Sequence, residues 1–384
     1  MAYLFTLPGR VVLGENALQA SAEIVKSLGN KAFIVTGKNV TKAGLMDILL
    51  HYLNQWGIDY EIYSEIIGEP TDKMIETGVA RFQQTECDFL IAIGGGSPLD
   101  SGKAIAVMSV LPGKISDYMG VEICGDFPPV VLIPTTAGTG SEATKFSIIT
   151  NKEKAVKMLL KGEAMLPKLA IIDPSFTMTV PPSVTAATGM DALTHAVEAY
   201  TSRKGNTLTD MYALSAISRI FQYLPKAYRD GNDEKAREEM SIAAFEAGVC
   251  INNASVTLVH GMSRPIGALF SVPHGISNAV LIYECLAYVL EGCYDRFAAI
   301  ARVIGAANTA DSDEKAAKAF LEQLRWLCSD CNIPTLKEYG IVKTDFDAVV
   351  DKMAQDAMDS SSPSNTIKVI EKKDLLIIYG RLWK

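Results

Sequence analysis

The stretch FLIAIGGGSPLD, residues 89–100, decides the fold of the first half of this 384-residue chain. It begins with five consecutive apolar residues, which are typical of a strand buried on both faces of a parallel sheet. Three glycines follow, and then Ser97 as the expected helix N-cap, Pro98 as the first helical residue and Asp100 three residues after the cap. The stretch therefore predicts a strand, a tight turn and a helix.

The same pattern extends over the first half and stops near residue 180. Apolar runs at 31–37, 130–134 and 169–174 alternate with helical patterns at 41–56 and 71–84, which indicates a doubly wound, Rossmann-like α/β domain over residues 1–180. After Pro181-Pro182 we expect an all-α domain over residues 181–384, with helices at 183–200, 207–224, 233–253, 294–304, 312–328 and 346–358.

The composition limits the class of protein and of partner. The chain has 36 Lys and Arg against 44 Asp and Glu, a net charge of −8, and 48% hydrophobic residues, which excludes a disordered chain and argues against nucleic-acid or membrane partners. No apolar run reaches the roughly 18 residues of a membrane span, and the first residues lack the features of a signal peptide. Seven scattered cysteines do not form a disulfide framework, so we expect a cytoplasmic protein.

Two turns are candidates for ligand contact. Gly94, Gly95 and Gly96 remove every Cβ where an anion could approach, and the N–H groups of the following helix favour a phosphate. The alternative is an ordinary turn, since no G-x-G-x-x-G fingerprint is present. The turn at 134–142 is rich in threonine and glycine; its alternative is a solvated loop in which Ser141 caps a helix. Because both turns follow apolar strands, we expect them at one sheet edge.

Three of the four histidines lie in the helical half. His195 follows Asp191 by four residues, so on a helix the two side chains share one face. With His260 and His274 they would supply one carboxylate and three imidazoles, a suitable ligand set for a divalent transition metal. The alternative is a hydrogen-bonded helix pair and two buried core histidines. We expect His51 on a helix surface or in packing.

Four segments, residues 94–100, 134–142, 189–198 and 260–275, together resemble the iron-containing (group III) alcohol dehydrogenase family, in order and over nearly the whole chain. The resemblance implies a dinucleotide-binding first domain, a helical metal-binding second domain, and interconversion of a primary alcohol and its aldehyde by hydride transfer with NAD(P)(H). It further implies a divalent metal, Fe²⁺ before Zn²⁺, a small alcohol or aldehyde substrate, and a homo-oligomer, a dimer or larger.

The same resemblance assigns residues to roles. It makes Asp191, His195, His260 and His274 the metal ligands and catalytic centre, and Phe146 and Arg264 the residues beside the substrate. The implied cofactor contacts are Gly37, Lys38, Gly94, Gly95, Gly96, Ser97, Asp100, Thr135, Thr136, Thr139 and Lys157.

Two departures from the family bear on specificity. Gly37 stands where NAD-preferring members carry an Asp, and Lys38 and Lys42 lie close by, so we expect NADP(H) or dual use; the alternative is a plain turn with solvated lysines. Arg264 stands where many members have another His. It either binds an anionic substrate group or pairs with a local carboxylate, and the sequence leaves both open.

Residues 362–365 also depart from the Asn-Pro-Arg segment of the family, which leaves the substrate open. The alternatives to an alcohol dehydrogenase are a hydroxyacid–oxoacid transhydrogenase, a glycerol-dehydrogenase-like polyol oxidase, a dehydroquinate-synthase-like lyase, and a non-catalytic scaffold.

Overall fold

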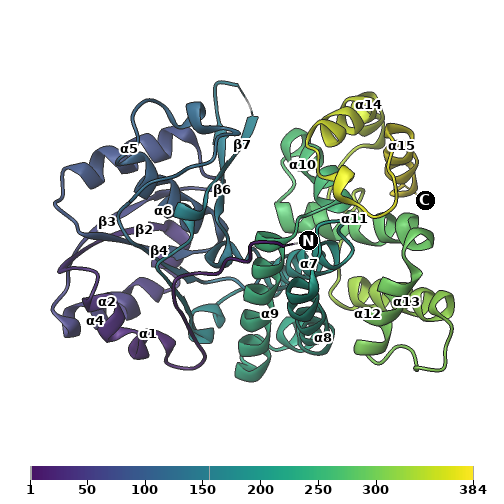
Figure 1. Ribbon diagram of the computed structural model, residues 1–384, viewed down its shortest axis with the longest axis horizontal. Helices are drawn as coiled ribbons and strands as arrows, with labels where there is room; N and C mark the ends of the chain where they lie inside the picture. The colour runs from purple at the N-terminus through teal and green to yellow at the C-terminus, as the bar shows by residue number, and fades with distance from the viewer. Residues whose placement is uncertain (1, 155, 384) are drawn as a thin grey trace. The chain divides into compact units, whose positions relative to one another are not determined.

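The computed structural model describes residues 2–154 and 156–383. The chain divides into two compact units, one up to Val180 and the other from Pro181 onward (Figure 1). The division falls where the sequence pattern changes from alternating strands and helices to helices alone.

The N-terminal unit contains a six-stranded parallel sheet, which confirms the expected α/β fold. The strand order is β1 (Val11–Leu13), β8 (Leu169–Ile172), β5 (Val130–Pro134), β4 (Phe89–Gly94), β2 (Lys31–Gly37) and β3 (Asp59–Ile66). The four apolar runs all form strands, and β8 ends before the predicted limit of 174. The sequence pattern missed β1, which is very short, and β3, an edge strand whose side chains are mostly exposed.

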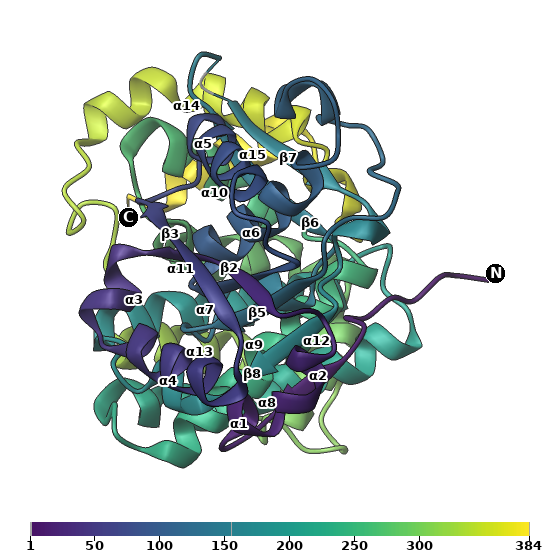
Figure 2. The ribbon, with the colours of Figure 1, turned by 90° about the vertical axis from the view of Figure 1, so that its left-hand side faces the viewer.

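Helices cover both faces of this sheet, as Figure 2 shows. On one face lie α1 (Ala17–Ala20), α2 (Ala22–Lys26), α3 (Lys38–Lys42) and α4 (Leu45–Trp56); on the other lie α5 (Asp72–Gln83) and α6 (Gly96–Met108). Alternate residues of one strand enter different cores, for example Phe33 and Ile34, which explains why the strands are apolar throughout. The single helix predicted at 41–56 is wrong, because Gly44, at φ +73°, separates α3 from α4.

A two-stranded antiparallel hairpin, β6 (Phe146–Asn151) and β7 (Val156–Lys161), completes the unit and was not predicted. Four short 3₁₀ helices connect these elements: η1 (Ile115–Tyr118), η2 (Ser141–Ala143), η3 (Glu163–Met165) and η4 (Pro174–Thr177).

The C-terminal unit is helical, as expected, and its described residues, 181–383, contain no strand. Its helices are α7 (Pro182–Tyr200), α8 (Thr207–Arg229), α9 (Glu234–Asn253), α10 (Leu258–Phe270), α11 (His274–Val289), η5 (Leu290–Gly292), α12 (Tyr294–Val303), α13 (Asp313–Asp330), α14 (Lys343–Asp359), η6 (Pro363–Asn365) and α15 (Lys372–Arg381). The predicted end of α8 at 224 is wrong: the helix continues through Pro225, where Leu224 and Ala227 are buried.

Within the described residues, no single helix is both long and apolar enough to cross a membrane. Helices α9 and α10 meet that criterion only as a pair, and the pair is bent by 102°.

Candidate metal centre and cofactor-binding edge

The glycine turn connects β4 to α6, but the predicted cap is wrong. Gly95 is the N-cap and Gly96 the first helical residue, so Ser97 and Pro98 occupy the second and third helical positions. Gly94 has φ +152°, and a Cβ on it would lie 2.6 Å from Cγ of Pro98. Only glycine allows the chain to turn this sharply, and the helix therefore begins earlier than the capping signal indicates.

The two predicted turns meet at one edge of the sheet, because β4 and β5 are neighbouring parallel strands. The amide of Thr135 donates to the carbonyl oxygen of Gly94 at 2.9 Å. A Cβ on Gly95 would lie 3.4 Å from Oγ1 of Thr136, and one on Gly96 only 3.0 Å from Cγ2 of Thr139. The glycines thus let the threonine turn approach, and Gly95, Gly96 and Ser97 remain partly exposed.

Asp100 holds the second turn in place. Its carboxylate accepts hydrogen bonds from the Ser141 hydroxyl and, at 2.8 Å, from the amide of Ile148. It also pairs with Lys103, Nζ to Oδ1 at 3.3 Å. Ser141 is the first residue of η2 and makes no capping bond, so the expectation that it caps a helix is wrong. The bonds of Asp100 link α6 to the threonine turn and to the hairpin.

Lys103 and Glu142 are buried beneath this turn, and sequence reasoning missed both. Nζ of Lys103 donates to the carbonyl oxygens of Ser141, at 3.0 Å, and of Phe146. The pKa of Lys103 is lowered, because the effect of burial outweighs the opposing effect of the nearby Asp100 carboxylate. Burial raises the pKa of Glu142 to about 7, and its Oε2 has no hydrogen-bond partner among the described residues. Neither residue carried a local signal, since a mid-helix lysine normally faces solvent.

The other predicted cofactor residues lie elsewhere in the unit. Gly37 ends β2 and is the N-cap of α3, and a Cβ on it would lie 2.7 Å from the carbonyl oxygen of Ile66. Lys38 and Lys42 are exposed on α3. Lys157, in β7, pairs with Glu69 at 2.6 Å. The structure therefore shows a steric reason for glycine at position 37.

Three helices of the C-terminal unit bring the four predicted ligands together. Asp191 and His195 lie on α7, His260 on α10, and His274 is the first residue of α11. Oδ1 of Asp191 lies 3.9, 3.7 and 3.6 Å from Nε2 of His195, His260 and His274, respectively. One ligand atom from each of the four residues lies within 4.8 Å of the others. The alternative of a helix pair with separate core histidines is wrong.

A buried glutamate orients one of these rings. Oε2 of Glu198 lies 2.5 Å from Nδ1 of His260, and Oε1 accepts from Thr257 at 2.8 Å and from the amide of Val259 at 2.6 Å. A carboxylate at Nδ1 keeps the proton there, so the lone pair on Nε2 faces Asp191. Burial foremost, then the charges on His195 and Arg264, lower the pKa of His260, which favours the neutral ring that a metal requires.

Asn278 provides the test of whether this set fits a cation. Its Nδ2 lies 2.7 Å from Oδ1 of Asp191, 3.1 Å from Nε2 of His260 and 3.2 Å from Nε2 of His274. An amide nitrogen only donates, so Oδ1 of Asp191 accepts from it, and the two imidazole nitrogens face the same electropositive group. Oδ1 of Asn278 is buried without a partner among the described residues. One carboxylate and three imidazoles therefore fit a divalent transition metal.

Sequence reasoning missed Glu198 and Asn278, although a signal existed for each. Glu198 follows His195 by three residues on α7, and Asn278 follows His274 by four on α11. Both spacings place a polar side chain on the face of a ligand.

The centre is open on one side. The side chains of Asp191, His195 and His260 are 3–6% exposed, whereas that of His274 is 36% exposed. Arg264 lies on α10, a helix that was not predicted, and its Nη1 donates to Oγ of Ser362 at 3.0 Å. In residues 2–154 and 156–383 it forms no ion pair with a carboxylate, although the charge of Glu198 acts on it: burial lowers the pKa of Arg264, and Glu198 opposes that shift.

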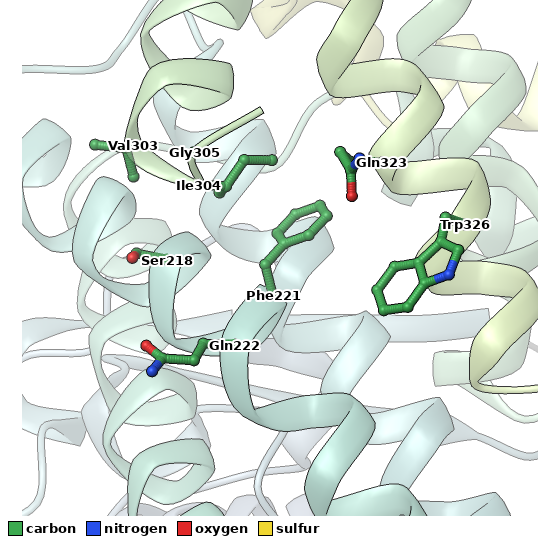
Figure 3. Close-up of a pocket in the computed structure, with 8 residues that line it drawn as sticks. All are labelled: Ser218, Phe221, Gln222, Val303, Ile304, Gly305, Gln323 and Trp326. Carbon is green, nitrogen blue, oxygen red and sulfur yellow. The ribbon is translucent and has the colours of Figure 1, made fainter. Parts of the chain in front are cut away.

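A separate pocket of about 400 Å³ lies between α8, α12 and α13. Phe221 and Trp326 line it together with Gln222 and Gln323 (Figure 3), and none of the predicted site residues does. Its lining contains no titratable group, so it offers no chemistry of the predicted kind.

Comparisons with known proteins agree with the geometry. Residues 8–174 match the family model of iron-containing alcohol dehydrogenase, and residues 185–383 match the C-terminal model of the Fe-containing alcohol dehydrogenase family. The chain is 37% identical to a 1,3-propanediol dehydrogenase of Klebsiella pneumoniae over 94% of both proteins. It is 36% identical to an NAD-dependent methanol dehydrogenase of Bacillus methanolicus, over 94% of this chain and 95% of the relative.

Two solved structures share the fold over almost their whole length. A 1,3-propanediol oxidoreductase superposes with a TM-score of 0.96 at 36% identity and covers 100% of both chains. An alcohol dehydrogenase from Oenococcus oeni superposes with a TM-score of 0.95 at 32% identity, covering 99% of this chain and 100% of its own.

Proposed function

Because the chain belongs to the iron-containing alcohol dehydrogenase family, we propose that Asp191, His195, His260 and His274 hold the divalent metal at which it works. The chain is an oxidoreductase that interconverts an alcohol and its aldehyde, with a divalent metal and a nicotinamide cofactor. The observation that carries the proposed ligand set is the convergence of four ligand atoms from three helices. The transhydrogenase and polyol-oxidase alternatives are not favoured, because the similar proteins are alcohol and propanediol dehydrogenases.

When bound, the metal supplies a Lewis acid for the oxygen of the alcohol or aldehyde, and the nicotinamide accepts or donates the hydride. Glu198 holds the proton of His260 on Nδ1 and so aims the Nε2 lone pair inward. Asn278 donates to Asp191 and orients that carboxylate. Burial of three of the four ligands excludes water from all but the side of His274. We propose Fe²⁺ as the resident ion; the nitrogen and oxygen donors also suit Zn²⁺.

For the cofactor, the proposed pyrophosphate site is the turn at Gly94, Gly95 and Gly96, together with Ser97. Two features support it: the absence of Cβ atoms at the start of α6, and the favourable end of that helix dipole. Thr135, Thr136 and Thr139 add hydroxyl donors from the neighbouring turn. Asp100 contributes indirectly, by fixing that turn through Ser141.

The proposed coenzyme preference is NADP(H), or both coenzymes. Position 37 carries no carboxylate to repel a 2′-phosphate, and Lys38 and Lys42 offer exposed positive charge beside it. The similar methanol dehydrogenase is described as NAD-dependent, so the two coenzymes must be compared directly. The ratio of kcat/KM for NADPH and NADH measures the preference, and a strong preference for NADH would overturn it.

Comparing Gly37→Ala with Gly37→Asp separates charge from bulk at this position. Both substitutions bring a Cβ against the carbonyl oxygen of Ile66, but only the second adds a carboxylate. Asp should lower kcat/KM for NADPH more than for NADH, whereas Ala should lower both alike.

The proposed substrates are small primary alcohols and their aldehydes, in line with the propanediol and methanol in the names of similar proteins. The test is reduction of a panel of aldehydes by enzyme stripped of metal and reconstituted with one ion at a time. We expect Fe²⁺ to restore the highest rate. An enzyme inactive toward every aldehyde with every ion would contradict the proposal. We also propose a homo-oligomer, which light scattering would measure, and cytoplasmic localisation stays a prediction.

A further inference from the structure

Arg264 differs in its partners from two other arginines of the C-terminal unit, Arg296 and Arg302. Arg296 pairs with Asp210 at 2.6 Å, and Arg302 pairs with Asp313 at 2.8 Å. The half-buried Arg264 has one neutral acceptor, Oγ of Ser362, and no other hydrogen bond or ion pair in residues 2–154 and 156–383. A guanidinium carries five N–H donors, so most of its donor capacity remains unused, and Glu198 acts on its charge without forming an ion pair.

Ser362 adds a second donor at the same place. The residue is buried, its Oγ accepts from Arg264, and the described residues contain no acceptor for its own hydroxyl proton. The segment it belongs to packs on α10, since a Cβ on Gly261 would lie 2.8 Å from Cδ of Pro363 and 3.5 Å from Cβ of Ser362. A guanidinium and a hydroxyl, both with protons to donate, therefore lie together against α10.

One of these two donors, Arg264, lies on the helix that carries a metal ligand. Arg264 follows His260 by four residues within α10, so the two side chains are on one face, with Cβ atoms about 5–6 Å apart. A short substrate whose carbonyl oxygen is at the metal centre would then have its far end near Arg264. An oxyanion there would accept charge-assisted hydrogen bonds, which are stronger than neutral ones.

We propose that Arg264 and Ser362 form an anion-binding subsite, and that the preferred substrate is a short aldehyde or alcohol bearing a carboxylate or a comparable oxyanion. This inference rests on the proposed function, because it requires the reacting end of the substrate to lie at the four-ligand centre. It favours the first of the two roles that the sequence left open for Arg264, since no carboxylate of the described residues forms an ion pair or hydrogen bond with it.

The test compares two four-carbon aldehydes, succinic semialdehyde and butanal, on the metal-loaded enzyme. We expect kcat/KM to be about tenfold or more higher for succinic semialdehyde, with most of the difference in KM. Arg264→Leu should lower kcat/KM for succinic semialdehyde far more than for butanal and so abolish that preference, and Arg264→Lys should restore part of it. Arg325→Gln removes an exposed arginine and is the matched control. Equal kcat/KM values in the wild type would overturn the proposal.

A measurement on the wild type alone covers the case in which Arg264→Leu does not fold. Succinate should inhibit butanal reduction competitively, whereas its neutral diamide should not; equal inhibition by both, or by neither, would overturn the subsite. The outcomes also separate the two proposals. Turnover of butanal without an anion preference contradicts only the subsite, while no turnover of any aldehyde contradicts the proposed function itself.

Discussion

The cofactor-binding edge and the metal centre are built from different parts of the chain. The edge is made of backbone, from two turns that follow neighbouring strands, and its glycines matter because they lack a side chain. The metal centre is made of side chains from three helices, and each contributes donor atoms that nothing nearby can replace. Damage to the two regions should therefore appear in different measurements: coenzyme KM for the edge, and metal content for the centre.

The largest expected effect is on the metal centre, from His260→Ala. The substitution removes one ligand and leaves Glu198 buried without its imidazole partner. We expect loss of bound metal and a fall in kcat of more than about a hundredfold, since loss of a supporting residue alone costs 10–100-fold. Metal analysis after dialysis, beside the control His51→Ala on α4, measures this. Retained metal and activity would mean that His260 is not a ligand.

At the cofactor-binding edge, the variant Gly94→Ala should act by changing the backbone conformation of the turn. A Cβ would lie 2.6 Å from Pro98 at φ +152°, so the turn must shift. We expect coenzyme KM to rise about tenfold, since backbone strain of this kind costs about 1–3 kcal/mol, and metal content to stay unchanged.

The matched control for the edge is Gly57→Ala, which also has a positive φ, of +70°, but has open space around it. This variant should lose stability without a change in coenzyme KM. A normal coenzyme KM in Gly94→Ala would contradict the assignment of the turn to the cofactor.

The variant Asn278→Ala tests whether the metal centre depends on supporting side chains as well as on its ligands. Asn278 donates to Asp191 at 2.7 Å, so its loss leaves that carboxylate free to rotate. Metal affinity, measured by competition with a chelator, should fall about 10–100-fold. Asn54→Ala, an exposed change on α4, should leave it unaltered. An unchanged affinity in Asn278→Ala would show that the amide does not orient Asp191.

The last expected effect concerns the stability of the edge, through Glu142, and leaves both coenzyme KM and metal content unchanged. Burial raises its pKa from the ordinary 4.5 to about 7, so the folded state binds this proton more tightly than the unfolded state does. The wild type should therefore lose up to about 3 kcal/mol of stability as the pH rises from 4.5 to 7. Glu142→Gln should lack that loss, which urea unfolding at pH 5 and pH 8 would detect. Equal pH dependence in the two proteins would contradict the raised pKa.

The predictability of the fold depended on how local each signal was. The limits of β2 and β5 were predicted correctly because an uninterrupted apolar run needs both faces of a sheet covered. Strand β3 was missed because its exposed side chains carry no such run. The start of α6 was misplaced because Ser97 and Pro98 are good capping residues, and the conformation of Gly94 outweighed them.

For the candidate sites, too, the sequence predicted only what a local signal indicates. Asp191 and His195 were recognisable as a pair because helical spacing alone puts them on one face. The partners of Lys103, a lysine that looks like any solvated residue of a helix, came only from packing. The sequence also could not show that the hydrogen-bond partner of Arg264 is Ser362 and not a carboxylate, because no residue spacing indicates which distant side chains meet in space.

Sequence alone therefore determined the buried strands of the sheet and several of the helices, where the glycine turn lies, and which side chains could ligate a metal, because these depend on neighbours within one or two turns of chain. Tertiary structure decided that His260 and His274 reach Asp191, that Glu198 and Asn278 support them, and that Arg264 forms no ion pair with a carboxylate of the described residues. These contacts depend on which faces of α7, α10 and α11 are buried against one another. The hydrophobic effect is non-directional, so the buried face of each helix is determined only by its packing against the other helices of the folded chain.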